Sequence, residues 1–365
     1  MQQSSAITIG LDVGDKHSQV CIIDSSGEAI EEARIPTTAK GIQRYFSSKS
    51  PAAVTLEVGT HSPWISRTLK EAGHAVIVAN ARKVRLIYGS TRKSDRLDAE
   101  KLARLTRHDV KLLAPIEHRS AQAQAHLACI RSRDALVRTR SSLVVHVRGS
   151  VKAFGKRLPS GDTSAFPKRA REHLPPELRP ALEPILAAIE ALTERIKQLD
   201  VEIKEIAARH YPRTEFLQQI TGVGLLTALT FQLIIEDPNR FSKSREVGPY
   251  LGLTPGEHQS GDRNPKRRVT REGDTLLRRL LVQCANYVIR TKTDSDLKRA
   301  AERIMSRGGH RSIAVTAVAR KLAVLLHHLW VTGEIYEPLY NHRTPTPGPT
   351  TPSTSPTPAV WTRRD

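Results

Sequence analysis

The sequence predicts an α/β domain at the N-terminus, followed by a mostly α-helical region. Three observations support this division. The first hundred residues alternate between β-rich runs and segments with helical spacing, and the chain beyond Pro115 shows helical spacing only. A length of 365 residues also exceeds what one small domain needs.

Three β-rich runs open the chain, and short polar breaks or turn residues separate them. They are Ile7–Gly14, Ser18–Asp24 and Glu28–Ile35. Connections this short favour antiparallel neighbours, so we expect three consecutive antiparallel strands.

Helices and strands then alternate. Pro63 follows Ser62, a good N-cap, and Asp95–His108 carries leucines at helical spacing. The expected elements are a helix at Ala39–Ser48, a strand at Ala52–Val58, a helix at Pro63–Gly73, a strand at His74–Asn80 and a helix at Asp95–His108. The order βββαβαβα is that of a ribonuclease-H-like domain.

Basic residues dominate the first helical stretch after this domain. Between Arg131 and Arg157 eight Lys and Arg residues accompany one acid, Asp134, while apolar positions keep one face buried. The candidate nucleic-acid contacts on this stretch are Arg131, Arg133, Arg138 and Arg140.

A loop rich in Pro, Gly and Ser is expected from Leu158 to about Pro180. Apolar residues then recur in steps of three and four, at Leu182, Ile185, Ile189, Leu192, Ile196, Leu199, Ile203 and Ile206. This heptad seam fits a coiled coil between two chains and equally a helix that packs within one chain.

Four regions follow from these patterns. They are an α/β catalytic domain at 1–114, a helical and coiled-coil segment at 115–212, a helical domain at 213–341 and a proline-rich, disordered tail at 342–365.

The net charge of +20 and the pI near 10.2 point to a polyanionic partner. Phosphate backbones are the commonest such partner, and an anionic membrane is the rival. We find no apolar run long enough to span a bilayer and no signal peptide at Met1–Thr8. The three cysteines, Cys21, Cys129 and Cys284, are far apart, which argues against disulfides or a zinc site and favours a reducing cytoplasm.

Four carboxylates lie where a metal site could form. Asp12 and Glu57 interrupt apolar strands, and Asp95 and Asp98 share one face of the following helix. Carboxylates this close repel one another unless divalent cations intervene, and Mg²⁺ prefers such hard oxygen ligands. Taken singly each acid is a weak signal, because Asp95 and Asp98 could simply serve the helix N-terminus.

Several motifs occur together and in order: LDVGDKHSQV, LEVGT, KSDRLDAEKLARL, QQITGVGLLTALTF and the segment Gly248–Ala285. Their combination resembles the DEDD transposases of bacterial insertion sequences. The resemblance implies a RuvC-like domain followed by a helical transposase domain. It also implies that Asp12, Glu57, Asp95 and Asp98 are the metal-binding tetrad.

The same resemblance implies that Ser260 is the nucleophile, that donor and target DNA are the substrates, and that a structured non-coding RNA, a bridge RNA, guides recombination. It further implies a homo-oligomer whose two domains complete one site between subunits. By itself Ser260 in HQSG would suggest only a turn. A basic cluster suited to phosphates surrounds it: Arg263, Lys266, Arg267, Arg268 and Arg271.

ITGVG resembles the hairpin of a helix-hairpin-helix, in which Gly222 and Gly224 would let backbone N–H groups approach a phosphate. A tight helix–helix turn with no ligand fits the pattern as well.

Three other functions stay open. A resolvase-like endonuclease could use metal-activated water, with Ser260 structural. The motif ITIGLDVGDKHSQVCIID also resembles the first phosphate loop of actin-like ATPases, although no second Gly-rich loop follows. An architectural nucleic-acid-binding protein would leave the acids within apolar strands unexplained.

Overall fold

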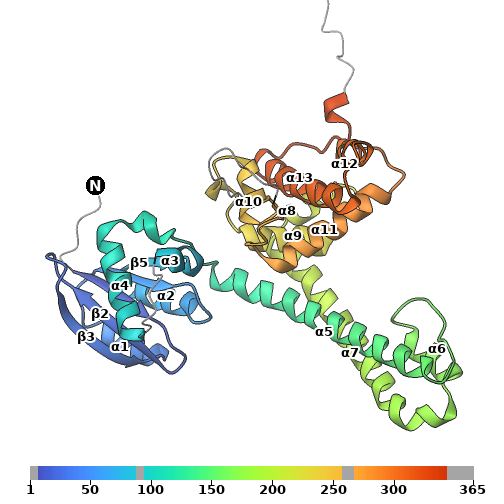
Figure 1. The fold of residues 1–365 in the computed structure, drawn as a ribbon, viewed down its shortest axis with the longest axis horizontal. Helices are drawn as coiled ribbons and strands as arrows, with labels where there is room; N and C mark the ends of the chain where they lie inside the picture. The colour runs from blue at the N-terminus through green and yellow to red at the C-terminus, as the bar shows by residue number, and fades with distance from the viewer. Residues whose placement is uncertain (1–6, 88–93, 257–266, 343–365) are drawn as a thin grey trace, which may run out of the picture. The chain divides into compact units, whose positions relative to one another are not determined.

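The computed structural model describes residues 7–87, 94–256 and 267–342 and separates into two compact units (Figure 1). The first unit ends at Ser120 and the second begins at Ala121. The predicted order, an α/β part followed by a mostly helical part, is confirmed. The predicted tail lies outside the described residues, apart from His342.

Five strands form one sheet in the order β3-β2-β1-β4-β5. The first three strands pair antiparallel, and β4 and β5 extend the sheet in parallel from β1. The strands are β1 (Thr8–Asp12), β2 (His17–Ile23), β3 (Ala29–Pro36), β4 (Ala53–Glu57) and β5 (Ala75–Ala79). Every strand predicted from the sequence is present, and the arrangement is ribonuclease-H-like.

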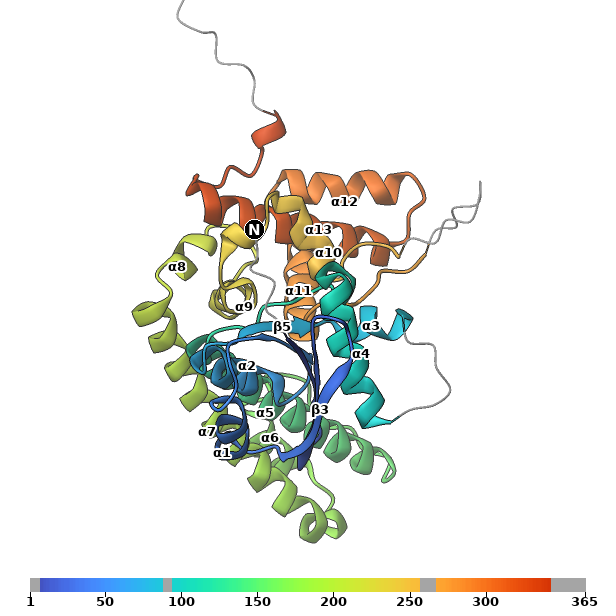
Figure 2. The same ribbon diagram turned by 90° about the vertical axis from the view of Figure 1, so that its left-hand side faces the viewer.

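Helices cover both faces of this sheet (Figure 2). Large apolar side chains of the first two helices pack on one face, where Ile42, Phe46, Ile65 and Leu69 join the strand residues of the core. The last helix packs on the other face through small residues, Ala99 and Ala103. The helices are α1 (Ala39–Phe46), α2 (Ser62–Glu71), α3 (Ala81–Ile87) and α4 (Asp95–His108), followed by a 3-10 turn at Val110–Leu113.

A hairpin of two long helices, α5 (Ala121–Lys152) and α7 (Arg179–His210), begins the second unit (Figure 1). The seam of α7 packs on α5 of the same chain, since Ile203 and Ile206 share one core with Leu127 and Ile130. The heptad pattern therefore serves packing within one chain.

The expected loop between these two helices is only partly correct, because it contains helix α6 (Phe166–His173). Phe166 and Ala170 are buried against Val147 and Val151 of α5. This apolar anchor offsets the many Pro and Gly residues around it, which had suggested an unstructured connection.

Six further helices lie in the described part of the second unit. Every residue of α9 from Thr227 to Ile235 is buried, and the core forms around it. The helices are α8 (Arg213–Leu217), α9 (Leu225–Ile235), α10 (Val247–Tyr250), α11 (Thr275–Arg290), α12 (Asp296–Ser306) and α13 (Arg311–Thr332). Short 3-10 turns lie at Pro176–Leu178, Pro238–Arg240, Ser244–Glu246 and Tyr340–His342.

Helix α13 meets the length and hydropathy of a membrane span, against the expectation that no such run exists. Half of its apolar window is buried inside the unit, and its buried residues between Ala314 and Leu329 contribute to the core. The core helix of a folded domain passes the same test, so this is weak evidence for a membrane.

Candidate active site

Two of the predicted carboxylates end neighbouring parallel strands. Leu11 of β1 lies opposite Leu56 of β4, so the next residues, Asp12 and Glu57, are the last of their strands and sit side by side. Residues in the same parallel register point to the same side of the sheet, and adjacent strands are about 4.8 Å apart. Both acidic side chains therefore leave the same edge of the sheet on one face.

That face is the one covered by α4. Gly10 lies two residues before Asp12, and a Cβ atom on it would come within 1.9 Å of the carbonyl oxygen of Ala99. Thr55 lies two residues before Glu57, and its Oγ1 accepts a hydrogen bond from Thr106 Oγ1 at 2.6 Å. Side chains alternate between faces along a strand, so Asp12 and Glu57 share the α4 face.

Two side-chain contacts fix the position of α4 on this face. Arg104, in the C-terminal half of the helix, donates to the carbonyl oxygen of Gly27 at 3.0 Å, beside the amino end of β1. At the other end of the helix, Arg96 forms an ion pair with Glu32 of β3 at 2.6 Å. These contacts place the first turn of α4 over β3 and its C-terminal half beside the turn between β2 and β3.

Asp95 and Asp98 occupy the first turn of α4. The carboxylate of Asp98 accepts from Lys101 Nζ at 3.1 Å, and both side chains are partly buried. Within residues 7–87, 94–256 and 267–342, no three His, Cys, Asp or Glu side chains are gathered closely enough to hold a metal ion. The fold places Asp12 and Glu57 at one edge of the sheet, and α4, which begins with Asp95 and Asp98, packs on the face to which they point.

A histidine that the sequence reasoning missed lies near this edge, at the start of α2. His61 Nε2 is 3.2 Å from Asp15 Oδ1, and Trp64 Nε1 donates to His61 Nδ1 at 3.1 Å. Because indole can only donate, Nδ1 accepts and the proton of the neutral ring lies on Nε2. This contact ties the loop after β1 to the loop after β4. The sequence feature that could have indicated this contact is the tryptophan three residues after the histidine.

Ser260 lies outside the described residues, together with Arg263 and Lys266. The chain on either side of this segment forms an antiparallel pair. Pro255 bridges to Val269, and Gly256 N–H donates to the carbonyl oxygen of Arg268 at 3.0 Å. The two ends of the serine-bearing segment are therefore held together.

The arginines predicted on α5 each have a partner inside the second unit. Arg131 pairs with Asp274 at 2.9 Å and Arg138 with Asp134 at 3.2 Å. Two others join α5 to α7, because Arg133 pairs with Asp200 at 2.8 Å and Arg140 donates to Thr193 Oγ1 at 3.1 Å. Arg131 and Arg138 remain more than half exposed, so a phosphate could still reach them.

Gly222 and Gly224 lie in the turn between α8 and α9. Gly222 has a φ of +91°, and a Cβ atom there would sit 3.0 Å from the ring of Tyr287, so the tight turn itself requires glycine. Gly224 is the exposed N-cap of α9, and nothing lies within 4 Å of the position that a Cβ atom would take there. The positive φ and the nearby Tyr287 ring therefore explain why position 222 is a glycine.

Comparison with known proteins agrees with this architecture. Residues 9–154 match a family model of IS110-type DEDD transposases described as "Transposase", and residues 214–301 match the model described as "Transposase IS116/IS110/IS902 family". The transposase for insertion sequence element IS1111A of Coxiella burnetii is 27% identical over 343 residues, covering 90% of each chain. The transposase for insertion sequence element IS1328 of Yersinia enterocolitica is 28% identical over 337 residues, covering 90% of this chain and 98% of that protein.

The two matched regions correspond to separate parts of the fold. The first covers the sheet, its helices and all of α5, and the second covers α8 through the first half of α12. The relatives span nearly the whole length in the same order. The chain is an enzyme of the IS116/IS110/IS902 family, an insertion-sequence transposase.

Proposed function

We propose that this transposase cuts and rejoins DNA with Mg²⁺ held by Asp12, Glu57, Asp95 and Asp98, and with Ser260 as the nucleophile. The observation that carries the metal part is the position of Asp12 and Glu57. They end adjacent parallel strands in register, on the face that α4, with Asp95 and Asp98 in its first turn, covers.

The donor set fits a hard divalent cation, because all four side chains offer carboxylate oxygens. When bound, such an ion would neutralise the carboxylates and stabilise negative charge on a phosphate. Asp98 now pairs with Lys101 at 3.1 Å, so binding a cation requires this carboxylate to turn away from the lysine.

In the proposed cleavage step, the Ser260 oxygen forms a bond to phosphorus while the bond from phosphorus to a sugar oxygen breaks. The serine proton passes to a neighbouring base, and the departing sugar oxygen takes up a proton. In rejoining, a sugar hydroxyl of the new partner strand attacks the same phosphorus and releases serine. No net oxidation or hydrolysis occurs, so the energy of the phosphodiester bond is retained.

The proposed partners are donor and target DNA, a bridge RNA that guides recombination, and further copies of this chain in a homo-oligomer. The net charge of +20 supports a polyanionic partner, and the resemblance to DEDD transposases supports the RNA and the oligomer. We place the reaction in the cytoplasm, which agrees with three unpaired cysteines.

Trapping of a covalent protein–DNA adduct tests the serine assignment. Wild type and Ser306→Ala, an exposed control serine, should form the adduct with Mg²⁺, whereas Ser260→Ala should not. An adduct that persists in Ser260→Ala means that another residue is the nucleophile. Cut DNA with free ends and no adduct in wild type would favour the resolvase-like reaction with activated water.

A further inference from the structure

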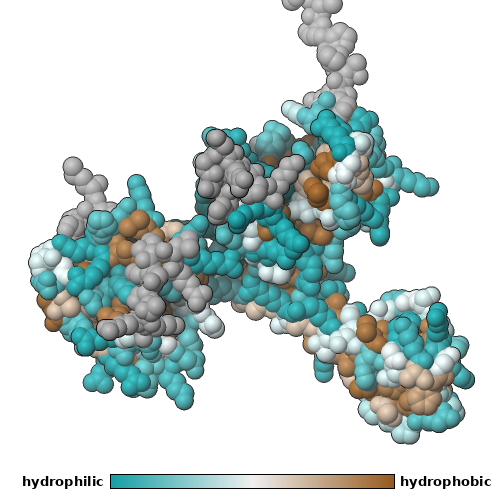
Figure 3. Space-filling view, viewed as in Figure 1, coloured by the Kyte–Doolittle hydropathy of each residue, from teal (hydrophilic) through white to brown (hydrophobic). Residues whose placement is uncertain are grey.

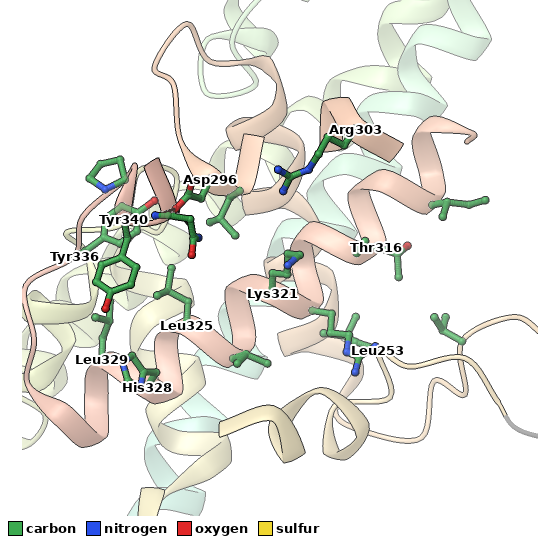
Figure 4. A pocket seen from close by; sticks show the side chains of 18 of the residues that line it. Leu253, Asp296, Arg303, Thr316, Lys321, Leu325, His328, Leu329, Tyr336 and Tyr340 are labelled. Atoms are coloured by element: carbon green, nitrogen blue, oxygen red, sulfur yellow. Dashed lines mark hydrogen bonds between the residues drawn. The ribbon is translucent and has the colours of Figure 1, made fainter. Parts of the chain in front are cut away.

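The second unit contains a large groove, whose lining includes Arg267, Arg268 and Arg271 of the predicted basic cluster. Its volume is about 2020 Å³, and its walls come from α12, α13, the chain on either side of the serine-bearing segment, and the stretch from Glu334 to Asn341 (Figure 4). Pockets for small ligands measure roughly 300–1,000 Å³, so this groove suits an extended, polymeric ligand.

The charge of the groove favours a polyanion. Six Lys and Arg side chains line it, against three acids, and none of the six forms an ion pair with an acid in the described parts of the chain. Two of the acids are already engaged, since Asp296 accepts from Asn341 at 2.8 Å and Glu334 pairs with His328 at 3.2 Å. The six cations are Arg267, Arg268, Arg271, Arg303, Arg320 and Lys321.

Apolar and aromatic side chains lie between these cations. Ile313 is 58% exposed and Tyr340 is 62% exposed, and Val324 and Leu325 of α13 also line the groove. Figure 3 shows apolar patches set among hydrophilic surface on this unit. Exposed apolar area of this kind is costly unless a ligand covers it.

A cationic groove with apolar and aromatic walls matches what single-stranded nucleic acid requires. Its phosphates contact the cations while its unpaired bases pack on aromatic and apolar surfaces. A duplex hides its bases and presents mainly phosphate and sugar, so it would leave the apolar wall uncovered. A helix from a second copy would suit the apolar wall but would leave the excess of cations unpaired.

We propose that this groove binds an unpaired stretch of nucleic acid. Phosphates lie against Arg303, Arg320 and Lys321, and bases lie against Ile313 and Tyr340. The inference builds on the proposed function, because Arg267 and Arg268 bring one wall of the groove to the end of the segment that carries Ser260. A strand in the groove would be an unpaired strand held beside the cleavage site during exchange.

Fluorescence anisotropy with the full-length protein tests this binding without requiring catalysis. The probes are a short labelled single strand of DNA, the same sequence as RNA, and the DNA duplex. Arg303→Ala with Lys321→Ala removes two exposed cations of the groove, and Arg195→Ala with Lys204→Ala removes two exposed cations of α7 as the matched control. Tyr340→Ala removes an aromatic wall at no change in charge.

We expect Arg303→Ala with Lys321→Ala to weaken binding of the single strand by roughly tenfold. The salt dependence of binding should fall by the equivalent of about two phosphate contacts. The control variant should change little in either measurement. Tyr340→Ala should weaken binding of the single strand by roughly fivefold or more and leave the duplex unaffected. Tighter binding of either single strand than of the duplex supports the proposal and identifies which nucleic acid the groove takes.

Equal loss in the groove and control variants would overturn the proposal, and so would a duplex that binds as tightly as the single strand and responds to Tyr340→Ala. A change of oligomeric state in light scattering, with single-strand binding intact, would assign the groove to a second copy instead. Ser260→Ala should bind the single strand like wild type, so failure of the serine assignment is distinguishable from failure of the groove.

Discussion

Gly10 decides how closely α4 can lie on the sheet. A Cβ atom there would come within 1.9 Å of the Ala99 carbonyl oxygen and 2.7 Å of the Ala103 nitrogen, both backbone atoms of the helix. Because helix backbone cannot yield as a flexible side chain does, glycine is required. This close contact seats α4 on the face of the sheet to which Asp12 points.

Gly10→Ala should therefore destabilise the N-terminal unit. Inserting a methyl group into a packed interior costs roughly 1–3 kcal/mol, and here the obstacle is a helix backbone. Amide hydrogen exchange in β1 and β4 measures the loss. Gly59→Ala is the control, since nothing lies within 4 Å of a Cβ atom at that position. Unchanged protection in Gly10→Ala would show that α4 does not rest on Gly10.

Residue type alone indicated the carboxylates as candidate metal ligands, but it did not indicate that α4 packs on Gly10. Asp12 and Glu57 stand out because an acid within an apolar strand is costly. Gly10, one glycine in a run of apolar residues, carries no such signal, because its role depends on a helix some ninety positions later in the chain. His61 was missed for a similar reason, since its contacts to Asp15 and Trp64 appear only after folding.

At the scale of elements, β3 is held to α1 by one ionic cluster. Lys49 Nζ lies 2.5 Å from Glu31 Oε2, and Tyr45 OH donates to Glu31 Oε1 at 2.7 Å. The hydrogen bonds from Lys49 and from Tyr45 lower the pKa of Glu31 below its usual range. Burial together with the Glu31 carboxylate raises the pKa of Tyr45.

Because the pKa of Glu31 is lowered on folding, its contribution is complete above the unfolded-state pKa of about 4.3 and is lost as the pH falls through the folded-state pKa. Glu31→Gln should lower the free energy of unfolding at pH 7 by at most about 1 kcal/mol, since the pair is partly exposed. The difference from wild type should vanish in strong acid. Urea unfolding against pH measures it, with exposed Glu28→Gln as the control; a difference that persists at low pH would contradict this account.

The helical elements show what periodicity can and cannot predict. The heptad spacing from Leu182 to Ile206 predicted a long helix with one apolar seam, and the structure has α7 with that seam. Spacing could not name the partner, which is α5 of the same chain. The Pro and Gly residues between 158 and 180 predicted a loop where the structure has α6. The burial of Phe166 against Val147 and Val151, which stabilises this helix, arises only in the folded chain.

At the scale of the whole molecule, the order of elements predicted the ribonuclease-H-like sheet because each strand and helix has its own local pattern. Charge predicted a polyanionic partner but not its binding surface. Arg133 and Arg140 of α5 instead join two helices. Six cations without a described acidic partner line the groove at α13, and three of them belong to the basic cluster predicted around Ser260. Which charges are already paired is a property of the fold, so composition could not separate the two groups.

We propose that carboxylates of the first unit and a serine of the second act in one metal-dependent reaction. The most direct test is strand joining in vitro with Mg²⁺, donor and target DNA, and RNA transcribed from the sequences flanking the gene. Wild type, Asp12→Ala and Ser260→Ala are compared with and without the RNA.

The account predicts joining by wild type only when RNA and Mg²⁺ are both present, and a loss of at least a hundredfold in each variant, as expected when a nucleophile or a metal ligand is removed. Joining that survives in Ser260→Ala, or that proceeds in Asp12→Ala, would contradict it.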